Sequence, residues 1–244
     1  MTAPPAQLVE FRSYELVPGG AGAFVEHFEA HFLASQEELG MDIVGQFTVA
    51  GRDDRFVWVR RYRDPARRAE ALAAFYGGPV WKAFGPRANE LMRDFTDVHL
   101  LVPDPSGPAF AAGHVAHADR PAGATAGATG TATAEGAGAG DVPGGTVVAA
   151  LYDRPGLDAD LAAAMDAALA RPGGTGRGAV RELGRLVTAG VANDFPRLPV
   201  HARPVVLWLL AGPGDGTAAE AVAAAVGTPA QLLRLRPTER STLR

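Results

Sequence analysis

The chain has 244 residues, of which 47% are hydrophobic, and carries a formal net charge of −4. This charge gives no global attraction to nucleic acid or to an anionic membrane. The absence of cysteine excludes disulfides, thiol nucleophiles and cysteine-ligated metal or iron–sulfur centres. Residues 1–5 do not resemble a signal peptide, and no stretch approaches the about 18 uninterrupted apolar residues of a membrane span. We therefore expect a cytoplasmic protein with no nucleic-acid or membrane partner.

Residues 1–103 predict a module with the order β-α-β-β-α-β. Each predicted strand has apolar residues at alternate positions and is bounded by turn residues. The strands are expected over residues 7–16, 43–49, 56–62 and 98–102. Residues 51–54 are the predicted turn between the second and third strands. Asp64-Pro65 predicts a helix start, because Asp is a favoured N-cap and Pro fits the first helical position. The order is that of the split βαβ, ferredoxin-like fold.

Residues 104–145 separate this module from a second one. Their composition changes to Ala, Gly, Thr and Pro, and large apolar side chains nearly vanish after Phe110. Such a segment cannot offset its own ordering entropy, so we expect a flexible linker with an r.m.s. reach of about 35 Å. That reach allows the flanking modules to pair within one chain as a pseudo-dimer, and a further homodimer stays open.

Residues 146–244 repeat the order of the first module. The predicted strands are residues 146–152, 179–187, 204–211 and 232–235. A helix is expected to open near Asp158, and Thr217 and Glu220 have the spacing of a capping box at the start of another helix. This half is expected to be degenerate, because it keeps the apolar residues of the first and loses most of the polar ones.

The Pro-Gly pair that follows the first strand of each module gives a way to compare the two copies. On this alignment the polar residues Glu10, Arg12 and Tyr14 have apolar equivalents, which are Val147, Ala149 and Leu151. These equivalents can neither donate a proton nor hold a carboxylate. We therefore expect an asymmetric protein with its site in the first module and a structural partner in the second.

Strand periodicity divides the first module's sheet into two faces. The polar and aromatic face carries Glu10, Arg12, Tyr14, Phe56, Trp58, Arg60 and Tyr62. The other face carries Val9, Phe11, Val57 and Val59, which are expected to oppose the second module. A plainer interpretation of the first face is that Glu10 and Arg12 pair at a sheet edge while Trp58 fills the core.

Several segments resemble NIPSNAP family proteins. In the first module these are residues 10–19, 75–82 and 87–92, and in the second module residues 193–200 and 233–241 resemble bacterial members. The resemblance covers nearly everything outside the linker. It implies the dimeric α/β-barrel superfamily, which includes cofactor-free monooxygenases, polyketide cyclases, isomerases and haem enzymes. Phe84 departs from it, because a histidine is expected there in many bacterial members.

The resemblance to barrel monooxygenases implies that the polar and aromatic face lines a cleft between sheet and helices. Our leading hypothesis is a cofactor-independent enzyme of secondary metabolism, acting on a hydrophobic, aromatic or polyketide-like molecule by cyclisation, isomerisation or dehydration. Arg12 would stabilise developing negative charge, Tyr14 would donate a proton, and His31 or Glu10 would be the base. The expected substrate-binding residues are Trp58, Arg60, Tyr62, Tyr76, Trp81 and Asn89. A cofactor-free monooxygenase and a non-catalytic binding or scaffold protein are the alternatives.

Three other features suggest a metal, haem or nucleic-acid site, and a plainer interpretation is preferred for each. His27 and His31 have the i, i+4 spacing of metal ligands, but no third ligand stands nearby, so no metal site is expected. His201 is only a weak candidate for a haem ligand. The basic cluster of residues 60–68 is expected to be a solvated surface, because its arginines fall on alternating strand faces and on a helix start.

Overall fold

The computed structural model describes residues 7–111, 145–170 and 180–244. The strands of the first half are β1 (Leu8–Leu16), β2 (Met41–Val49), β3 (Arg52–Tyr62) and β4 (Met92–Pro103). Its helices are α1 (Ala21–His31), α2 (Leu33–Glu37), the 3-10 turn η1 (Pro65–Arg67), α3 (Arg68–Gly77) and α4 (Pro79–Leu91). Asp64 caps η1 by accepting a hydrogen bond from the backbone N–H of Ala66, as the Asp-Pro pair predicts.

The second half has the same alternation of elements. They are β5 (Thr146–Tyr152), α5 (Ala159–Leu169), β6 (Arg181–Thr188), β7 (Val206–Gly212), α6 (Thr217–Ala224) and β8 (Gln231–Pro237). The strand order of this half, β8-β5-β7-β6, repeats the order β4-β1-β3-β2 of the first half. Asp158 caps α5 through its side chain, as predicted.

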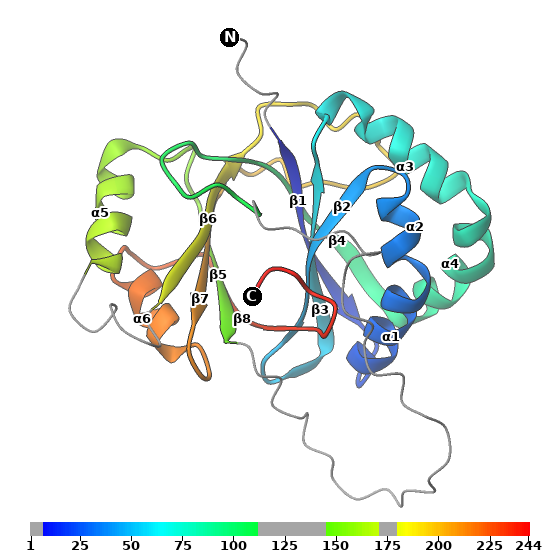
Figure 1. Ribbon diagram of the computed structural model, residues 1–244, viewed down its shortest axis with the longest axis horizontal. Coiled ribbons are helices and arrows are strands. Elements are labelled where there is room, and N and C mark those ends of the chain that lie inside the picture. The colour runs from blue at the N-terminus through cyan, green and yellow to red at the C-terminus, as the bar shows by residue number, and fades with distance from the viewer. Residues whose placement is uncertain (1–6, 112–144, 171–179) are drawn as a thin grey trace, which may run out of the picture.

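The two four-stranded sheets close into one barrel with the order β1-β3-β2-β8-β5-β7-β6-β4. All neighbouring strands are antiparallel. Closure rests on two short seams, in which residues 47–49 of β2 pair with 235–237 of β8 and residues 101–103 of β4 pair with 186–188 of β6. The helices of the first half lie on one side of the barrel and α5 and α6 lie on the opposite side (Figure 1).

The barrel interior is an apolar core built by both halves. From the first half it receives Val9, Phe11, Val57 and Val59, as the strand periodicity predicts. From the second half it receives Val147, Ala149, Leu151, Leu207 and Leu209. Each outer face of the barrel is covered by the helices of its own half and forms a separate core cluster. The two halves therefore share their central core, and this shared core determines how they sit together.

Two local predictions are wrong. The turn after β2 lies at Ala50-Gly51, and residues 52–54 already belong to β3. Gly51 adopts a φ of 74°, which glycine reaches without steric cost. Thr217 and Glu220 form no capping box, because Gly216 is the N-cap of α6 and Glu220 binds Arg234 instead.

The expected linker lies mostly outside the described residues. Residues 104–111 are described, and Phe110 is buried in the barrel interior with 3% of its surface exposed. The carbonyls of Phe110 and Ala111 accept hydrogen bonds from Arg61 Nη1 at 3.4 and 3.1 Å. None of the helices that the structure describes has the length and apolar character needed to cross a membrane.

Candidate functional site

A pocket of about 220 Å³ lies between the outer face of the first half's sheet and its helices. Its walls are mainly aromatic, and they include Phe24, Phe28, Phe32, Trp58, Phe75 and Trp81. Its polar lining is small and consists of Arg12, Tyr14, Gln36, Tyr76, Asn89 and Arg197. An apolar cavity with a few convergent polar groups is the usual form of a small-molecule site.

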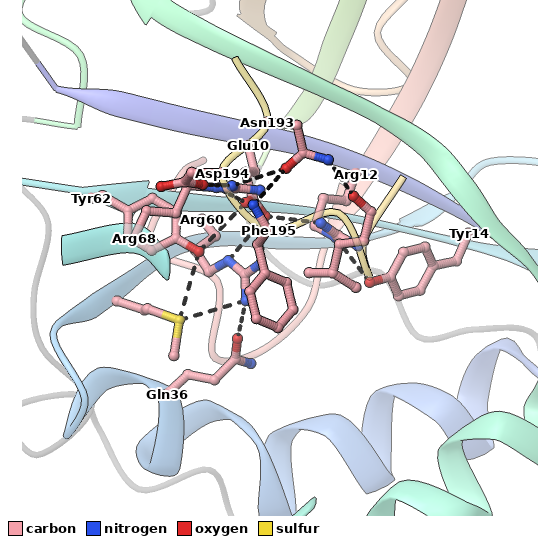
Figure 2. Close-up of polar contacts among 12 residues, drawn as sticks. Glu10, Arg12, Tyr14, Gln36, Arg60, Tyr62, Arg68, Asn193, Asp194 and Phe195 are labelled. Atoms are coloured by element: carbon pink, nitrogen blue, oxygen red, sulfur yellow. Dashed lines mark hydrogen bonds and ion pairs between the residues drawn. The ribbon is translucent and has the colours of Figure 1, made fainter. Parts of the chain in front are cut away.

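A buried cluster of charges lies at the floor of this pocket (Figure 2). Glu10 has no exposed surface, and its carboxylate accepts hydrogen bonds from Arg12 Nη1 at 2.9 Å, from Arg60 Nε at 3.1 Å and from Arg68 Nε at 2.8 Å. Burial alone would raise the pKa of Glu10, but the charges of Arg60, Arg12 and Arg68 outweigh burial and hold this pKa far below its ordinary value. Glu10 is therefore ionised, and its lone pairs are used by the arginines.

The other contacts of the cluster leave a net positive charge. Arg60 Nη1 donates to Gln36 Oε1 at 2.7 Å, and Arg68 Nη1 binds the carboxylate of Asp194. Three buried guanidinium groups thus face two carboxylates, those of Glu10 and Asp194, and the Asp194 side chain is 42% exposed. The uncompensated charge is nearest the pocket at Arg12, the one arginine of the three that lines it.

Arg12 and Tyr14 form the polar corner of the pocket. Arg12 Nε donates to the Tyr14 hydroxyl oxygen at 2.9 Å, so the phenolic proton of Tyr14 is free for another acceptor. Burial lowers the pKa of Arg12, but Tyr14 and Glu10 raise it above its ordinary value, and the guanidinium stays charged. The guanidinium also lies over the rings of Tyr14 and Trp58, at 5.5 and 5.4 Å from their centroids.

Two buried donors of the pocket lining have no partner among the residues that the structure describes. They are Arg12 Nη2 and Trp58 Nε1. A buried donor without a partner costs about 1–3 kcal/mol, and more when it is charged. The polar corner of the pocket is therefore suited to a ligand that brings hydrogen-bond acceptors and negative charge.

The segment that connects β6 to β7 completes the pocket from the second half. Phe195, Arg197 and Leu198 line the pocket, and the ring of Phe195 stacks on Tyr76 with centroids 6.0 Å apart. Asn193 Oδ1 accepts a hydrogen bond from Arg68 Nη1 at 3.2 Å. The expectation that the second half is only a structural partner is therefore wrong. The segment between β6 and β7 has no helix or strand. It therefore leaves no periodic pattern in the sequence from which its lining residues could have been predicted.

The structure separates the predicted site residues into two groups. Arg12, Tyr14, Trp58, Tyr76, Trp81 and Asn89 line the pocket. Glu10, Arg60 and Tyr62 lie behind it and are fully buried. Burial raises the pKa of the Tyr62 phenol far above its ordinary value, so this hydroxyl stays protonated and donates toward Glu10 Oε1 at 3.5 Å.

His31 lies away from the pocket lining, on the last turn of α1. Its ring stacks on Phe84 with centroids 3.6 Å apart, and burial and the neighbouring His27 lower its pKa. His27 is bound through Nε2 to the carbonyl oxygen of Phe84 at 2.9 Å. The base role expected of His31 would require a different position for this helix, and Glu10 is saturated by arginines.

The expected solvated surface at residues 60–68 is only partly exposed. Arg60, Arg61 and Arg68 are 0%, 3% and 1% exposed, whereas the side chains of Arg63 and Arg67 are 69% and 68% exposed. The prediction fails for Arg60 and Arg68 because both bind the fully buried carboxylate of Glu10. It fails for Arg61 because this residue binds Asp42 and the carbonyls of Phe110 and Ala111. The composition of this stretch does not distinguish the buried Arg68 from its exposed neighbours.

The Pro-Gly alignment of the two halves is wrong by one residue. Arg12 is paired across the strands with Trp58, and Ala150 is paired in the same way with Trp208. The outer-face equivalents of Glu10, Arg12 and Tyr14 are therefore Val148, Ala150 and Tyr152. A shift of one residue moves every side chain to the other face of a sheet, which is why Val147, Ala149 and Leu151 lie in the barrel interior.

The second half keeps the tyrosine but has no charged residue at the positions equivalent to Glu10 and Arg12. The Tyr152 hydroxyl donates to the carbonyl oxygen of Ala223 at 2.8 Å, and burial raises its pKa to about 12. Ala150 stands where the first half has Arg12, and the buried arginine of this face is Arg185 of β6, which pairs with Glu182 and Asp166. The two outer faces therefore differ in where their buried arginines lie and in how these are paired.

A closed barrel with helices on two opposite sides defines an α/β-barrel, and solved structures share this fold over nearly the whole chain. A candidate chlorite dismutase is 14% identical and covers 98% of this chain and 97% of its own, with a TM-score of 0.50. A candidate monooxygenase from Fusobacterium nucleatum subsp. nucleatum is 8% identical and covers 97% and 94%, with a TM-score of 0.53. At these identities the likeness shows the fold alone, a closed antiparallel barrel flanked by helices.

Residues 9–106, in the first half of the chain, match the model of the NIPSNAP family. A NIPSNAP family protein from Agrobacterium tumefaciens str. C58 is 21% identical, covers 41% of this chain and 94% of its own, and has a TM-score of 0.38. No curated protein matches the sequence. A match to a family model does not by itself specify a reaction.

Proposed function

We propose that this protein is a cofactor-independent enzyme that binds a hydrophobic, aromatic or polyketide-like anion in the first-half pocket. The observation that carries the proposal is the pair of buried donors, Arg12 Nη2 and Trp58 Nε1, which have no partner among the described residues. They lie in an aromatic cavity beside an uncompensated positive charge. An aromatic body would fill the cavity, and a carboxylate, phenolate or enolate oxygen would satisfy both donors.

The proposed chemistry is proton transfer through an enolate. Arg12 would stabilise the developing oxyanion, because a preorganised charged donor is effective where negative charge forms. Tyr14 would give up its free phenolic proton to the substrate, while its oxygen stays bound to Arg12 Nε. Glu10 holds the Arg12 guanidinium in place and is a positioning residue. Cyclisation by an aldol step, isomerisation and dehydration of a β-hydroxy ketone all pass through such an enolate.

A non-catalytic binding protein is the second candidate. It is favoured by one observation: within the described part of the chain, the pocket lining contains no carboxylate and no imidazole. An enzyme of the proposed kind would then need a water molecule or a group of the substrate as its base. Turnover by the purified protein separates the two candidates, and oxygen uptake during turnover would indicate the cofactor-free monooxygenase reaction instead.

We further infer that the two halves are copies of one ferredoxin-like module that pair as an intramolecular pseudo-dimer. The repeated strand order supports this inference. So does the equivalence of Trp58 with Trp208 and of Tyr14 with Tyr152 in the cross-strand register. In this view the first copy kept the charged residues Glu10 and Arg12, and the second copy has Val148 and Ala150 at the equivalent positions.

Arg12→Ala and Tyr14→Phe test the site. With 1-naphthoate as a small aromatic anion and tryptophan fluorescence as the readout, we expect Arg12→Ala to weaken binding at least ten-fold, which is about 1.4 kcal/mol. Tyr14→Phe removes one oxygen atom, so a loss of binding or turnover in this variant with an unchanged melting temperature assigns the effect to the hydroxyl. Neutral 1-naphthamide should bind the parent protein and Arg12→Ala about equally.

Arg87→Ala is the matched control, because the Arg87 side chain is 56% exposed on α4 and pairs with its neighbour Glu90. This variant should bind 1-naphthoate like the parent. Equal affinity of parent and Arg12→Ala for the anion would contradict the proposal. Haem or flavin in the native mass spectrum and visible spectrum of the purified protein would contradict its cofactor-independent character.

A further inference from the structure

A second group of functional side chains lies on the face of β4 opposite the pocket. Asp97 and His99 are two residues apart on this strand, so their side chains share one face. In the register with β1, His99 is paired with Phe11 and Asp97 with Ser13. Cross-strand partners share a face, and Phe11 belongs to the barrel interior. This group is therefore separate from the Arg12 pocket.

His201 joins this group from the segment that connects β6 to β7. The backbone N–H of His201 donates to the carbonyl oxygen of Val98 at 2.8 Å, so the segment is docked on β4 between the two other side chains. His201 Nε2 lies 3.0 Å from Asp97 Oδ1, and His99 Nε2 lies 3.6 Å from the same oxygen. The three candidate ligand atoms all lie within 4.8 Å of one another.

This arrangement matches the donor set of a transition-metal site. Two imidazoles and one carboxylate are a common set of three protein ligands for zinc and for non-haem iron. A tetrahedral ion with bonds of about 2.0–2.2 Å holds its ligand atoms about 3.3 Å apart. The distances from Asp97 Oδ1 to the two imidazole nitrogens, 3.0 and 3.6 Å, bracket that value, and the two nitrogens lie within 4.8 Å of each other. His99 is 3% exposed while Asp97 and His201 are 26% and 43% exposed, so solvent reaches the remaining coordination positions.

The backbone already holds the three side chains close together. Asp97 and His99 belong to a strand paired with β1, and the docked segment is tied to the same edge of β4 at two points, by Ala189 N–H to Leu100 O and by His201 N–H to Val98 O, both at 2.8 Å. An ion would therefore require small side-chain movements rather than a rearrangement of the chain. Binding costs less when the ligands are organised in advance.

We propose that Asp97, His99 and His201 bind one divalent transition-metal ion of the zinc type, and that the ion fastens the β6–β7 segment to β4. The same segment carries Phe195 and Leu198 into the Arg12 pocket and binds Arg68 through Asn193. Metal binding on one face of the sheet would thus stabilise the cover of the pocket on the other face. Imidazole ligands favour zinc, cobalt, nickel or copper over magnesium and calcium.

Cobalt(II) is the probe for the site, because its visible absorption reports the coordination. The full-length protein, stripped of metal with EDTA, should bind one Co²⁺ per chain with the visible bands of a four- or five-coordinate ion, and Zn²⁺ should displace it while Mg²⁺ does not. His201→Ala should weaken Co²⁺ binding more than about 100-fold, since loss of even an outer-shell partner costs 10–100-fold. His201 is exposed, so this variant should fold.

The matched control is His31→Ala, because His31 and His27 form the competing pair with ring centroids 4.9 Å apart. This variant should bind Co²⁺ like the parent. A protein that shows no visible Co²⁺ spectrum, or that keeps it in His201→Ala, would show that Asp97 merely joins the two imidazoles by hydrogen bonds, and would overturn the proposal. Loss of binding in His31→Ala would move the site to α1 and overturn it as well.

Proteolysis tests the fastening of the segment. Arg197 is exposed on it and offers trypsin a cleavage site. Zinc should slow cleavage after Arg197 at least ten-fold in the parent protein and leave the rate in His201→Ala unchanged, with mass spectrometry identifying the cut. An unchanged rate in zinc-loaded parent protein would overturn the fastening. Neither measurement depends on turnover or on the ligand of the Arg12 pocket.

Discussion

Replacing Glu10 with Gln is expected to lower the free energy of unfolding by roughly 3–5 kcal/mol, because it leaves buried arginines without their carboxylate. Glu10 is the partner of Arg12, Arg60 and Arg68, which are all at most 1% exposed. After the substitution Asp194 would be the carboxylate that still pairs with this cluster within the described part of the chain. Chemical denaturation monitored by circular dichroism measures the change, which is a large share of the about 5–15 kcal/mol that stabilises most domains.

Glu220→Gln is the matched control for this substitution. Glu220 binds Arg234 through both carboxylate oxygens at 2.6 Å, but the two side chains are 22% and 39% exposed. An exposed pair contributes about 0–1 kcal/mol, so this variant should lose little stability. Equal losses in the two variants would show that burial of the Glu10 cluster has no special cost and would contradict the argument.

The loss caused by Glu10→Gln should depend on pH. The pKa of Glu10 in the folded protein is far below the ordinary value of 4.5, so the folded state binds this proton less readily than the unfolded state. The stability from Glu10 is therefore fully present above the unfolded-state pKa and is lost as the pH falls below it toward the folded-state pKa. The difference in unfolding free energy between parent and variant should shrink between about pH 5 and pH 2.

The second large effect is expected from Val59→Asp in the barrel interior. Val59 is 1% exposed and packs in the core that both halves build. An unpaired carboxylate there should cost roughly 3–5 kcal/mol. Because the core is shared, hydrogen exchange should accelerate in β7 of the second half as well as in β3. The same substitution at Val191, which is 53% exposed, should change little.

Hydrogen exchange followed by mass spectrometry resolves the two halves in one experiment. The parent protein should unfold in a single transition, because each sheet presents one of its faces to the other. Two transitions in the parent protein, or protection of β7 that Val59→Asp leaves untouched, would contradict a common core. In that case the two halves would fold as independent domains.

The sequence alone was sufficient for the features that depend on neighbours in the chain. The alternation along β1 and β3 separates Arg12 and Trp58 from Val9 and Val59, because the side-chain period of a strand is a local property. Asp64-Pro65 marked a helix start for the same reason, since capping involves residues two or three positions away. These faces and the resemblance to NIPSNAP proteins predicted six of the residues that line the pocket, namely Arg12, Tyr14, Trp58, Tyr76, Trp81 and Asn89.

Only the tertiary structure decided the features that join distant parts of the chain. The burial of Arg68 depends on Glu10 and on Asp194, which lie 58 and 126 residues away from it. Asp97 and His201 meet across 104 residues, because the β6–β7 segment docks on the edge of β4. The face of each residue in β5 depended on a register that the Pro-Gly pair does not determine, since one residue of offset exchanges the two faces. Local patterns thus determined which residues lie on each face of the first sheet. Contacts between distant parts of the chain determined the pairing of the buried charges, the segment that covers the pocket and the grouping of the candidate metal ligands.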